Sequence, residues 1–220
     1  MTTQNQGLFI AFEGGDGAGK STQASLLAAA LESRGHTVLR TREPGGTPIG
    51  EKLRSLVLDH GHGHIDARTE ALIFAASRAA HATQVIRPAL EDGTVVLSDR
   101  YIDSSVAYQG AGRNLGADAV RTLNNWATDE LHPDLTVLLD VEPAIGRQRR
   151  TAGEAVEDRM ESEADEFHCR IREAFLALAQ SAPETYLVLP AHQAVEELSA
   201  QILARVTTLL DAVPPLELAP

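Results

Sequence analysis

A glycine-rich stretch near the N-terminus constrains the fold of this chain more than any other feature. It reads Gly14-x-x-x-x-Gly19-Lys20-Ser21, the pattern typical of loops that bind phosphate groups. A short apolar run of strand length precedes it at 8–12, and apolar residues with helical spacing follow it in 23–34. Because the motif requires a strand before the loop and a helix after it, these flanks favour phosphate binding over a simple connecting turn.

The residues of this loop suit phosphate binding for separate physical reasons. Glycines let the backbone turn tightly, so that successive N–H groups face one concave site. The start of the following helix adds unpaired N–H donors and the positive end of its dipole. Lys20 brings a positive charge to the β- and γ-phosphates, and the Ser21 hydroxyl is a ligand for Mg2+.

Five apolar runs of strand length alternate with helical patterns along the chain. They lie at 8–12, 37–41, 94–98, 135–140 and 185–189. The segments between them are too long for hairpins and suit crossover helices, which predicts an α/β fold with a parallel sheet and helices on both faces. At 220 residues the chain is expected to form a single domain, 1–220, with a loose proline-rich tail at 213–220.

The composition limits the classes of partner. Acidic residues outnumber basic ones 31 to 19 and the net charge is −12, which argues against nucleic acid as the main partner. A small phosphorylated substrate needs only a local positive pocket. Residues 1–7 are polar, so no signal peptide is expected, and no apolar stretch approaches the ~20 residues that cross a bilayer. The single cysteine, Cys169, fits a reducing cytoplasm and is interpreted as incidental rather than catalytic.

Two further loops are expected at the same edge of the sheet as the glycine loop, because ligands of open parallel sheets bind beyond the carboxyl ends of the strands. Thr41-Arg42-Glu43-Pro44-Gly45-Gly46-Thr47 follows the second run, and its arginine suits an anionic substrate. The third run ends in Asp99-Arg100. Asp99 is placed to hold a magnesium-bound water and Arg100 to span two phosphate groups; the alternative is an ion pair that caps a strand.

A basic cluster at Arg147, Arg149 and Arg150 follows the fourth run in an otherwise acidic protein. Gly153 and the small residues around it would permit movement, so the segment is interpreted as a lid that brings arginines over a phosphoryl group. A solvated basic helix face remains the alternative.

The pattern at 66–90 predicts a helix whose apolar surface is wider than one core-facing stripe. Small residues on its second face favour a dimer interface, while simple burial in a large domain is the alternative. Helices are also predicted at 160–180 and 193–212. The preceding Gly61-His62-Gly63-His64 is interpreted as a solvated loop rather than a metal site, because no further Cys or His clusters nearby.

Taken in order, these stretches resemble the thymidylate kinase family of P-loop nucleoside monophosphate kinases, over about residues 8–210. The resemblance rests on the glycine loop combined with Thr41-Arg42-Glu43-Pro44-Gly45-Gly46 and with Asp99-Arg100-Tyr101-Ile102-Asp103-Ser104-Ser105-x-Ala107-Tyr108-Gln109-Gly110. It implies the family's fold, a five-stranded parallel sheet of order 2-3-1-4-5. It also implies that ATP with Mg2+ donates its γ-phosphate to dTMP, giving dTDP and ADP in dTTP synthesis.

The same resemblance implies roles for individual residues. Phe74 matches the aromatic side chain that stacks on thymine, and Arg78 matches the residue that hydrogen-bonds the base. Tyr108 matches the position that crowds C2′ and so disfavours ribonucleotides, and Asp16 matches an acidic position near the sugar 3′-hydroxyl. Pro44 is expected to follow a cis peptide bond.

Four sets of site residues follow from the resemblance. The ATP-binding set is Gly14, Gly15, Asp16, Gly17, Ala18, Gly19, Lys20, Ser21 and Thr22. The dTMP-binding set is Arg42, Glu43, Pro44, Arg54, Phe74, Arg78, Arg100, Ser104, Ser105, Tyr108 and Gln109, with Arg42, Arg54 and Arg100 around the phosphate and Ser105 and Gln109 lining the base pocket. The catalytic set is Lys20, Arg100, Asp16, Arg149 and Arg150, and the metal set is Ser21 and Asp99.

The lid separates two subtypes of the family. Some members place an arginine inside the glycine loop and lack basic residues in the lid. Here positions 16–18 carry no basic residue, so the chain is similar to the bacterial subtype whose lid, about 146–159, supplies the catalytic charge. Which of the three lid arginines does so stays open. A cytoplasmic homodimer that associates through 66–90 is expected.

Three rival functions remain on the sequence. A deoxyribonucleoside kinase also pairs a glycine loop with an Asp-Arg step and a lid, but the Arg-Glu-Pro-Gly-Gly loop favours a monophosphate acceptor. A GTPase switch would need a guanine-reading Asn-Lys-x-Asp stretch, which the sequence lacks. A regulatory nucleotide-binding protein without turnover is disfavoured by the charged residues at every expected catalytic position.

Overall fold

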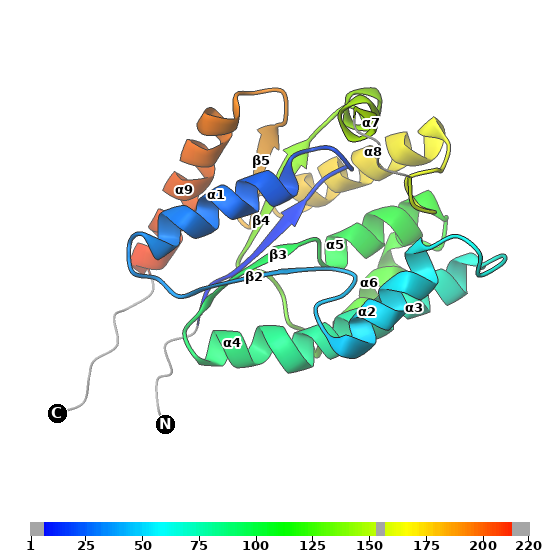
Figure 1. The fold of residues 1–220 in the computed structure, drawn as a ribbon, viewed down its shortest axis with the longest axis horizontal. Helices are drawn as coiled ribbons and strands as arrows, with labels where there is room; N and C mark the ends of the chain where they lie inside the picture. The colour runs from blue at the N-terminus through cyan, green and yellow to red at the C-terminus, as the bar shows by residue number, and fades with distance from the viewer. Residues whose placement is uncertain (1–6, 153–156, 213–220) are drawn as a thin grey trace.

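The computed structural model describes residues 7–152 and 157–212. Its strands form one parallel sheet of order β2-β3-β1-β4-β5, as the resemblance implied (Figure 1). The strands are β1 (Phe9–Glu13), β2 (Val38–Arg42), β3 (Val95–Asp99), β4 (Leu135–Asp140) and β5 (Tyr186–Pro190). Four of them lie one residue later than the sequence pattern predicted, and β4 lies where it was predicted.

Helices cover both faces of the sheet, as predicted (Figure 1). They are α1 (Lys20–Glu32), α2 (Pro48–Leu58), α3 (Ala67–His81), α4 (Arg87–Glu91), α5 (Ile102–Ser105), α6 (Ala117–Thr128), α7 (Pro143–Thr151), α8 (Asp165–Ser181) and α9 (Val195–Ala212). Two π-helical segments, η1 (Ala82–Ile86) and η2 (Val106–Gly112), continue α3 and α5.

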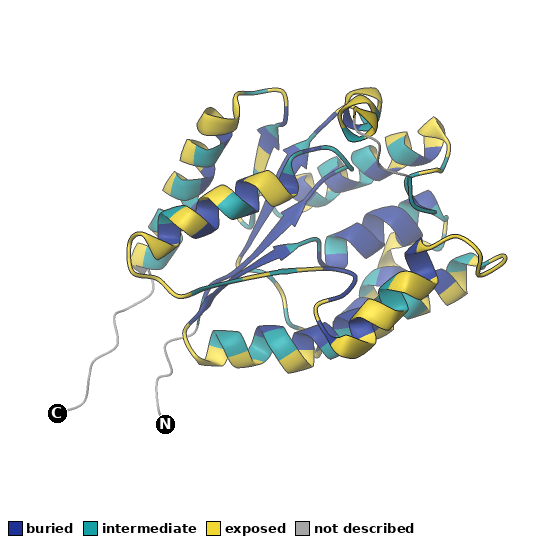
Figure 2. Ribbon diagram, in the orientation of Figure 1, coloured by how far each residue is buried: buried dark blue, intermediate teal, exposed yellow. Residues whose placement is uncertain are grey.

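Alternation along β1 divides the core between the two faces. Ile10 and Phe12 belong to the cluster that packs beneath α1 and α9, whereas Phe9 and Ala11 belong to a cluster on the opposite face. Successive side chains of a strand point to opposite faces, so a central strand covered on both sides must be apolar at every position. Figure 2 shows the central strands β1, β3 and β4 buried, whereas the edge strands β2 and β5 are partly exposed.

The predicted helix at 66–90 is divided in the structure. Asp66 caps α3 by accepting hydrogen bonds from the backbone N–H groups of Arg68 and Thr69. The helix then widens into the π-helical segment η1 before α4 ends at Glu91. One face of this element is buried, as at Ala75, while Leu72 on another face is 56% exposed.

The helix predicted at 160–180 begins later, at Asp165. The Asp158 carboxylate accepts the backbone N–H groups of Met160 and Glu161 at 2.8 and 2.9 Å. This side-chain turn competes with helix formation and holds the segment in a turn. The predicted lid of 146–159 is helical as far as Thr151 within α7. Gly153 and the predicted loose tail at 213–220 lie outside the described residues.

Within 7–152 and 157–212, no helix combines the length and the apolar character that a membrane crossing requires.

Candidate active site

The glycine loop joins β1 to α1 at the carboxyl edge of the sheet, and its backbone requires glycine at two positions. Gly14 and Gly17 have φ angles of 129° and 79°, in the region that side chains rarely adopt. A Cβ on either would lie 2.3 Å from a backbone oxygen, that of Leu139 or Gly146. The loop therefore folds back against β4 and α7, and it leaves Lys20 and Ser21 in the first turn of α1.

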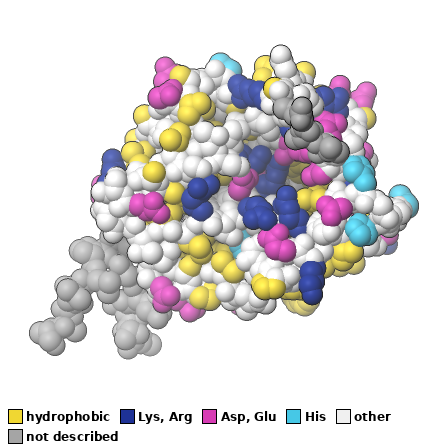
Figure 3. Space-filling view, in the orientation of Figure 1, with side chains coloured by type: hydrophobic (Ala, Val, Ile, Leu, Met, Phe, Trp, Pro, Cys, Tyr) yellow, Lys and Arg dark blue, Asp and Glu magenta, His cyan; other side chains and the backbone are white. Residues whose placement is uncertain are grey.

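A cavity of about 500 Å³ lies over this loop. Residues of the ATP-binding set line it, namely Asp16, Gly17, Gly19, Lys20, Ser21 and Thr22. Its six basic side chains are Lys20, Arg42, Arg54, Arg100, Arg149 and Arg150. Figure 3 shows Lys and Arg side chains gathered in a hollow on this face. An acidic protein thus carries a locally positive cavity, which we call the phosphate cavity.

Oxygen atoms suited to Mg2+ lie at the wall of the phosphate cavity. The Ser21 hydroxyl donates a hydrogen bond of 2.5 Å to the Asp99 carboxylate, and both residues line the cavity. Hydroxyl and carboxylate oxygens are hard ligands, and Mg2+ in kinases is held by one or two of them together with substrate phosphates. The two residues of the predicted metal set therefore fit the ion.

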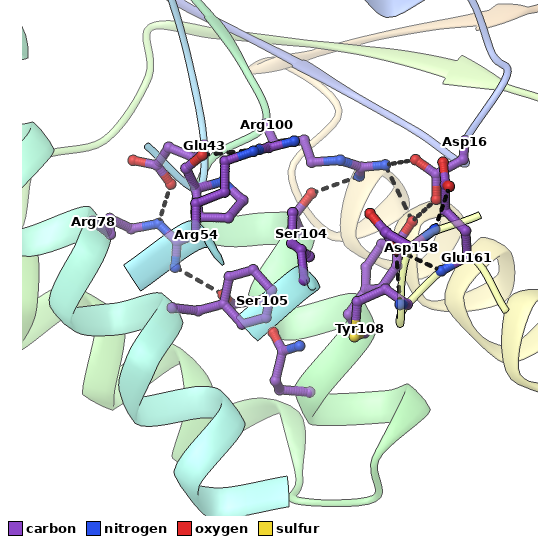
Figure 4. Close-up of a pocket in the computed structure, with 15 residues that line it drawn as sticks. Asp16, Glu43, Arg54, Arg78, Arg100, Ser104, Ser105, Tyr108, Asp158 and Glu161 are labelled. Carbon is purple, nitrogen blue, oxygen red and sulfur yellow. Dashed lines mark hydrogen bonds and ion pairs between the residues drawn. The ribbon is translucent and has the colours of Figure 1, made fainter. Parts of the chain in front are cut away.

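A second cavity, of about 160 Å³, adjoins the first, and we call it the base cavity (Figure 4). Ten of the eleven residues of the predicted dTMP-binding set line it: Glu43, Pro44, Arg54, Phe74, Arg78, Arg100, Ser104, Ser105, Tyr108 and Gln109. The eleventh, Arg42, lines the phosphate cavity and pairs with Glu51 at 2.9 Å. The two cavities share Asp16, Glu43, Arg54, Arg100 and Glu161.

Arg100 stands at the junction of the two cavities. Its guanidinium ion pairs with Asp16 and donates to the Ser104 hydroxyl at 2.9 Å and to the Tyr108 hydroxyl at 3.2 Å (Figure 4). Tyr108 in turn donates to Asp16 at 3.1 Å. Arg100 itself has a φ of 72°, a sparsely populated backbone conformation that aims its side chain back across the sheet edge toward the glycine loop.

These contacts set the charges of the junction. Burial alone would raise the pKa of Asp16, but the charges of Arg100 and Lys20 hold that pKa well below its usual range. Burial lowers the pKa of Lys20, and the neighbouring Arg100 lowers it further. Lys20 Nζ donates to the backbone oxygens of Gly14 and Gly15 at 3.2 and 3.0 Å, which holds the ammonium in the loop.

Arg78 is 2% exposed and is held by four acceptors. Its Nε donates to Glu43 at 2.6 Å, one Nη donates to Ser105 and Asn124, and the other donates to the backbone oxygen of Tyr101 at 3.0 Å. Glu43 lines both cavities, and one of its carboxylate oxygens is occupied by Arg78.

The second oxygen of Glu43 binds a buried histidine. His81 Nδ1 lies 2.9 Å from this oxygen, and His81 Nε2 lies 2.6 Å from the Thr41 hydroxyl. A carboxylate only accepts hydrogen bonds, so Nδ1 carries the proton. The Glu43–Pro44 peptide bond is cis, as the resemblance implied. The loop after β2 is thus fixed to α3 by a chain of buried contacts.

The three lid arginines lie in different places. Arg149 and Arg150 line the phosphate cavity, and Arg147 does not. Arg149 donates to the backbone oxygen of Ala191 at 3.0 Å, and Arg150 pairs with Glu157 at 2.6 Å. Arg147 pairs with Asp165 at 2.7 Å. Arg149 and Arg150 are therefore the lid arginines that face the phosphate cavity.

Comparison with known proteins identifies the family. A family model described as thymidylate kinase matches residues 12–202. The chain belongs to the thymidylate kinase family.

Individual relatives agree with this family over almost the whole chain. A thymidylate kinase from Clavibacter michiganensis subsp. michiganensis is 54% identical over 206 residues, which cover 94% of this chain and 97% of the relative. One from Cutibacterium acnes is 51% identical and covers 93% of this chain and 98% of the relative. The crystal structure of thymidylate kinase from Ehrlichia chaffeensis matches with a TM-score of 0.75 at 30% identity, covering 92% of this chain and 99% of that one.

Several residues that line the thymidylate kinase site were missed by the sequence reasoning. Leu58, Asp158, Met160 and Glu161 complete the base cavity. They come from the end of α2 and from the turn before α8, and no local pattern in the sequence marks them. Only the packing of that turn against α2 brings them to the cavity, through a hydrogen bond of 3.0 Å from Arg159 N to the Leu58 oxygen.

Two buried carboxylates were also missed. Glu13 ends β1 and accepts hydrogen bonds from Tyr101 N at 2.8 Å and from the Ser104 hydroxyl at 2.6 Å. Burial raises its pKa to about 7, against the opposing charge of Arg100. Glu70 lies in α3, four residues before Phe74 and eight before Arg78. That helical spacing places the three residues on one face of α3, so the sequence could have indicated that Glu70 lies near the base cavity.

Proposed function

We propose a division of roles among these residues for the reaction of the family. As a member of the thymidylate kinase family, the chain is an enzyme that transfers the γ-phosphoryl group of ATP to dTMP, giving dTDP and ADP in dTTP synthesis. The observation that carries our assignment is that the two cavities share Asp16 and Arg100. Ligands in the two cavities then meet end to end, with the donor over the glycine loop and the acceptor beside α3.

The phosphate cavity supplies the positive charge that the transfer requires. Phosphoryl transfer depends mainly on alignment and on electrostatic stabilisation of the moving group. Lys20 binds the β- and γ-phosphates of the donor, Arg100 spans donor and acceptor phosphates, and Arg149 and Arg150 approach from the lid. Ser21 and Asp99 would hold Mg2+, which when bound neutralises charge on the β- and γ-oxygens.

The base cavity holds and selects the acceptor. Phe74 gives the thymine ring a stacking surface, and Arg42, Arg54 and Arg100 surround the dTMP phosphate. Tyr108 is held between Arg100 and Asp16 by hydrogen bonds of 3.2 and 3.1 Å, which fixes its ring against the sugar position. In this assignment the fixed ring faces C2′ and disfavours a ribose hydroxyl, and Asp16 contacts the 3′-hydroxyl.

We further propose that one kinase domain, 1–220, with a lid near 146–159, works as a cytoplasmic homodimer. Leu72 on α3 and Trp126 on α6 are 56% and 80% exposed, and the two helices contact each other, so a partner copy would bury apolar surface on both. Sedimentation of the wild type and of a Leu72→Glu variant checks the dimer. A wild-type monomer would refute the homodimer, and a variant that stays fully dimeric would show that the interface does not involve this face of α3.

An acceptor screen tests the function. With ATP and Mg2+, we expect release of ADP when dTMP is the acceptor and none with thymidine. Consumption of thymidine without dTMP would instead indicate a deoxyribonucleoside kinase. Binding of both nucleotides without release of ADP would indicate a regulatory protein.

A further inference from the structure

Glu70 is a buried carboxylate whose partners come from two separate parts of the chain. Its exposed fraction is 0%. Gln109 Nε2 donates to it at 2.9 Å from η2, Arg113 Nη2 at 3.1 Å from just beyond η2, and Arg159 Nη2 at 2.7 Å from the turn before α8. The mechanism proposed above does not use this group. Two arginines compensate its charge, and Gln109 is its one neutral partner among the described residues.

The carboxylate decides which way the Gln109 amide faces. A carboxylate only accepts hydrogen bonds, so the amide atom beside it must be the NH2 nitrogen. Gln109 Oε1 is therefore turned to the other side, and none of the donors in 7–152 and 157–212 reaches it. Because Gln109 lines the base cavity, that oxygen is a fixed acceptor for a base.

Arg78 supplies the complementary donor. A guanidinium has five N–H groups. Glu43, Ser105, Asn124 and the Tyr101 oxygen take four of them within the described residues, so one remains on a residue that lines the cavity. The Gln109 oxygen can accept the N3–H of thymine, and the remaining Arg78 N–H can donate to thymine O4. Cytosine offers the opposite pair, an unprotonated N3 and an amino group.

We propose that Glu70 is a positioning residue that selects thymine over cytosine by fixing the orientation of the Gln109 amide. This inference rests on the proposed function, because it requires dTMP in the base cavity. Glu70 does not touch the substrate; it acts through Gln109, and the two arginines hold it in place. Specificity follows from a site whose buried polar groups are left unpaired by the wrong base.

The test compares dTMP with dCMP as acceptors, using ATP and Mg2+. Glu70 Oε1 accepts from Gln109 and from Arg113 Nε, whereas Oε2 accepts from Arg159 Nη2 and from two nitrogens of Arg113. In Glu70→Gln the remaining oxygen is therefore expected at the Oε2 position, with the new amino group facing Gln109. Gln109 then turns its own oxygen toward that group and its NH2 into the cavity. We expect the ratio of kcat/KM for dTMP over dCMP to fall by ~10-fold or more, mainly through KM for dTMP. Glu70→Asp keeps a carboxylate and should keep the preference, even if KM rises.

A reciprocal swap completes the design. In Glu70→Gln/Gln109→Glu, the new carboxylate accepts from the new amide and turns its second oxygen into the cavity, so the preference for dTMP should return. The swap also keeps the number of buried charges, which makes it the deciding variant if Glu70→Gln does not fold. An unchanged ratio in Glu70→Gln, an equal loss in Glu70→Asp, or a swap without thymine preference would overturn the proposal. A wild type that phosphorylates no dTMP would instead refute the proposed function.

Discussion

The Ser21 hydroxyl donates a hydrogen bond of 2.5 Å to the Asp99 carboxylate, although the two residues are 78 positions apart. β1 pairs with β3 in parallel, so the glycine loop and the end of β3 meet at one edge of the sheet. A hydroxyl and a carboxylate beside a basic phosphate cavity are suited to hold Mg2+ together with phosphate oxygens of a bound nucleotide.

Removal of the metal gives the first prediction. Chelation by EDTA should abolish turnover, and added Mg2+ should restore it. Asp99→Asn should raise the Mg2+ concentration for half-maximal activity by ~10-fold or more, because a neutral amide binds the ion and its water less well. The exposed Asp92→Asn is the matched control and should behave as wild type. An unchanged requirement in Asp99→Asn would remove Asp99 from the metal site.

Arg100 gives the second prediction. Arg100→Ala should fold and lose kcat by ~100-fold or more, because a fixed charge at the junction of the two cavities is removed. Steady-state kinetics with ATP and dTMP and a circular dichroism melt measure both effects. Arg40 is an exposed arginine of β2, and Arg40→Ala is the control for the loss of a charge alone. Normal turnover in the Arg100→Ala variant would show that the Arg100 side chain takes no part in the phosphoryl transfer.

The lid arginines give the third prediction. Arg149→Ala and Arg150→Ala should each lower kcat, with at least one falling by ~100-fold, because both line the phosphate cavity. Arg147→Ala serves as the matched control from the same helix and should fall far less, since it pairs with Asp165 outside that cavity. If Arg147→Ala is the most damaging of the three, the assignment is wrong.

Phe74 gives the fourth prediction. Phe74→Ala should raise KM for dTMP by ~10-fold, because stacking of a base on an aromatic ring contributes about 1–3 kcal/mol. The KM for ATP should change little, since Phe74 lines only the base cavity. Arg68→Ala, at an exposed position of the same helix, controls for an effect on helix stability. An unchanged KM for dTMP would exclude the stacking role.

Glu13 gives the fifth prediction, on stability against pH. Burial raises its pKa from 4.5 to about 7, so between these values the folded state binds more protons than the unfolded state. This contribution to the free energy of unfolding is complete below the lower value and is lost as pH rises through the upper one. Its size is at most roughly 3 kcal/mol.

The measurement for Glu13 is urea unfolding at about pH 5 and about pH 8. Glu13→Gln mimics the protonated carboxyl and does not titrate. Relative to this variant, the wild type should become less stable as the pH is raised. The raised pKa would be contradicted if the difference in free energy of unfolding between the two proteins were the same at both pH values. It would also be contradicted if the wild type gained stability relative to the variant at the higher pH.

Much of the fold followed from short-range patterns. The apolar runs predicted all five strands to within one residue. The signal was strongest for β1, β3 and β4, because a central strand covered on both faces needs apolar residues along most of its length. The order of the strands came from the family resemblance instead. Periodicity alone did not reveal the π-helical segment after α3 or the late start of α8. Both features depend on local hydrogen bonds, such as those that the Asp158 carboxylate accepts before α8. The pattern of apolar residues carries no information about such bonds.

The sequence by itself determined the chemistry of the phosphate cavity, because its loops follow strands whose carboxyl ends must share an edge. The tertiary structure alone decided which lid arginines reach that cavity and that Glu43 holds Arg78 and His81. It also placed the turn at 158–161 on the base cavity and brought Gln109, Arg113 and Arg159 to Glu70. Each of these depends on how helices distant in sequence pack together, and no single stretch of the chain encodes that packing.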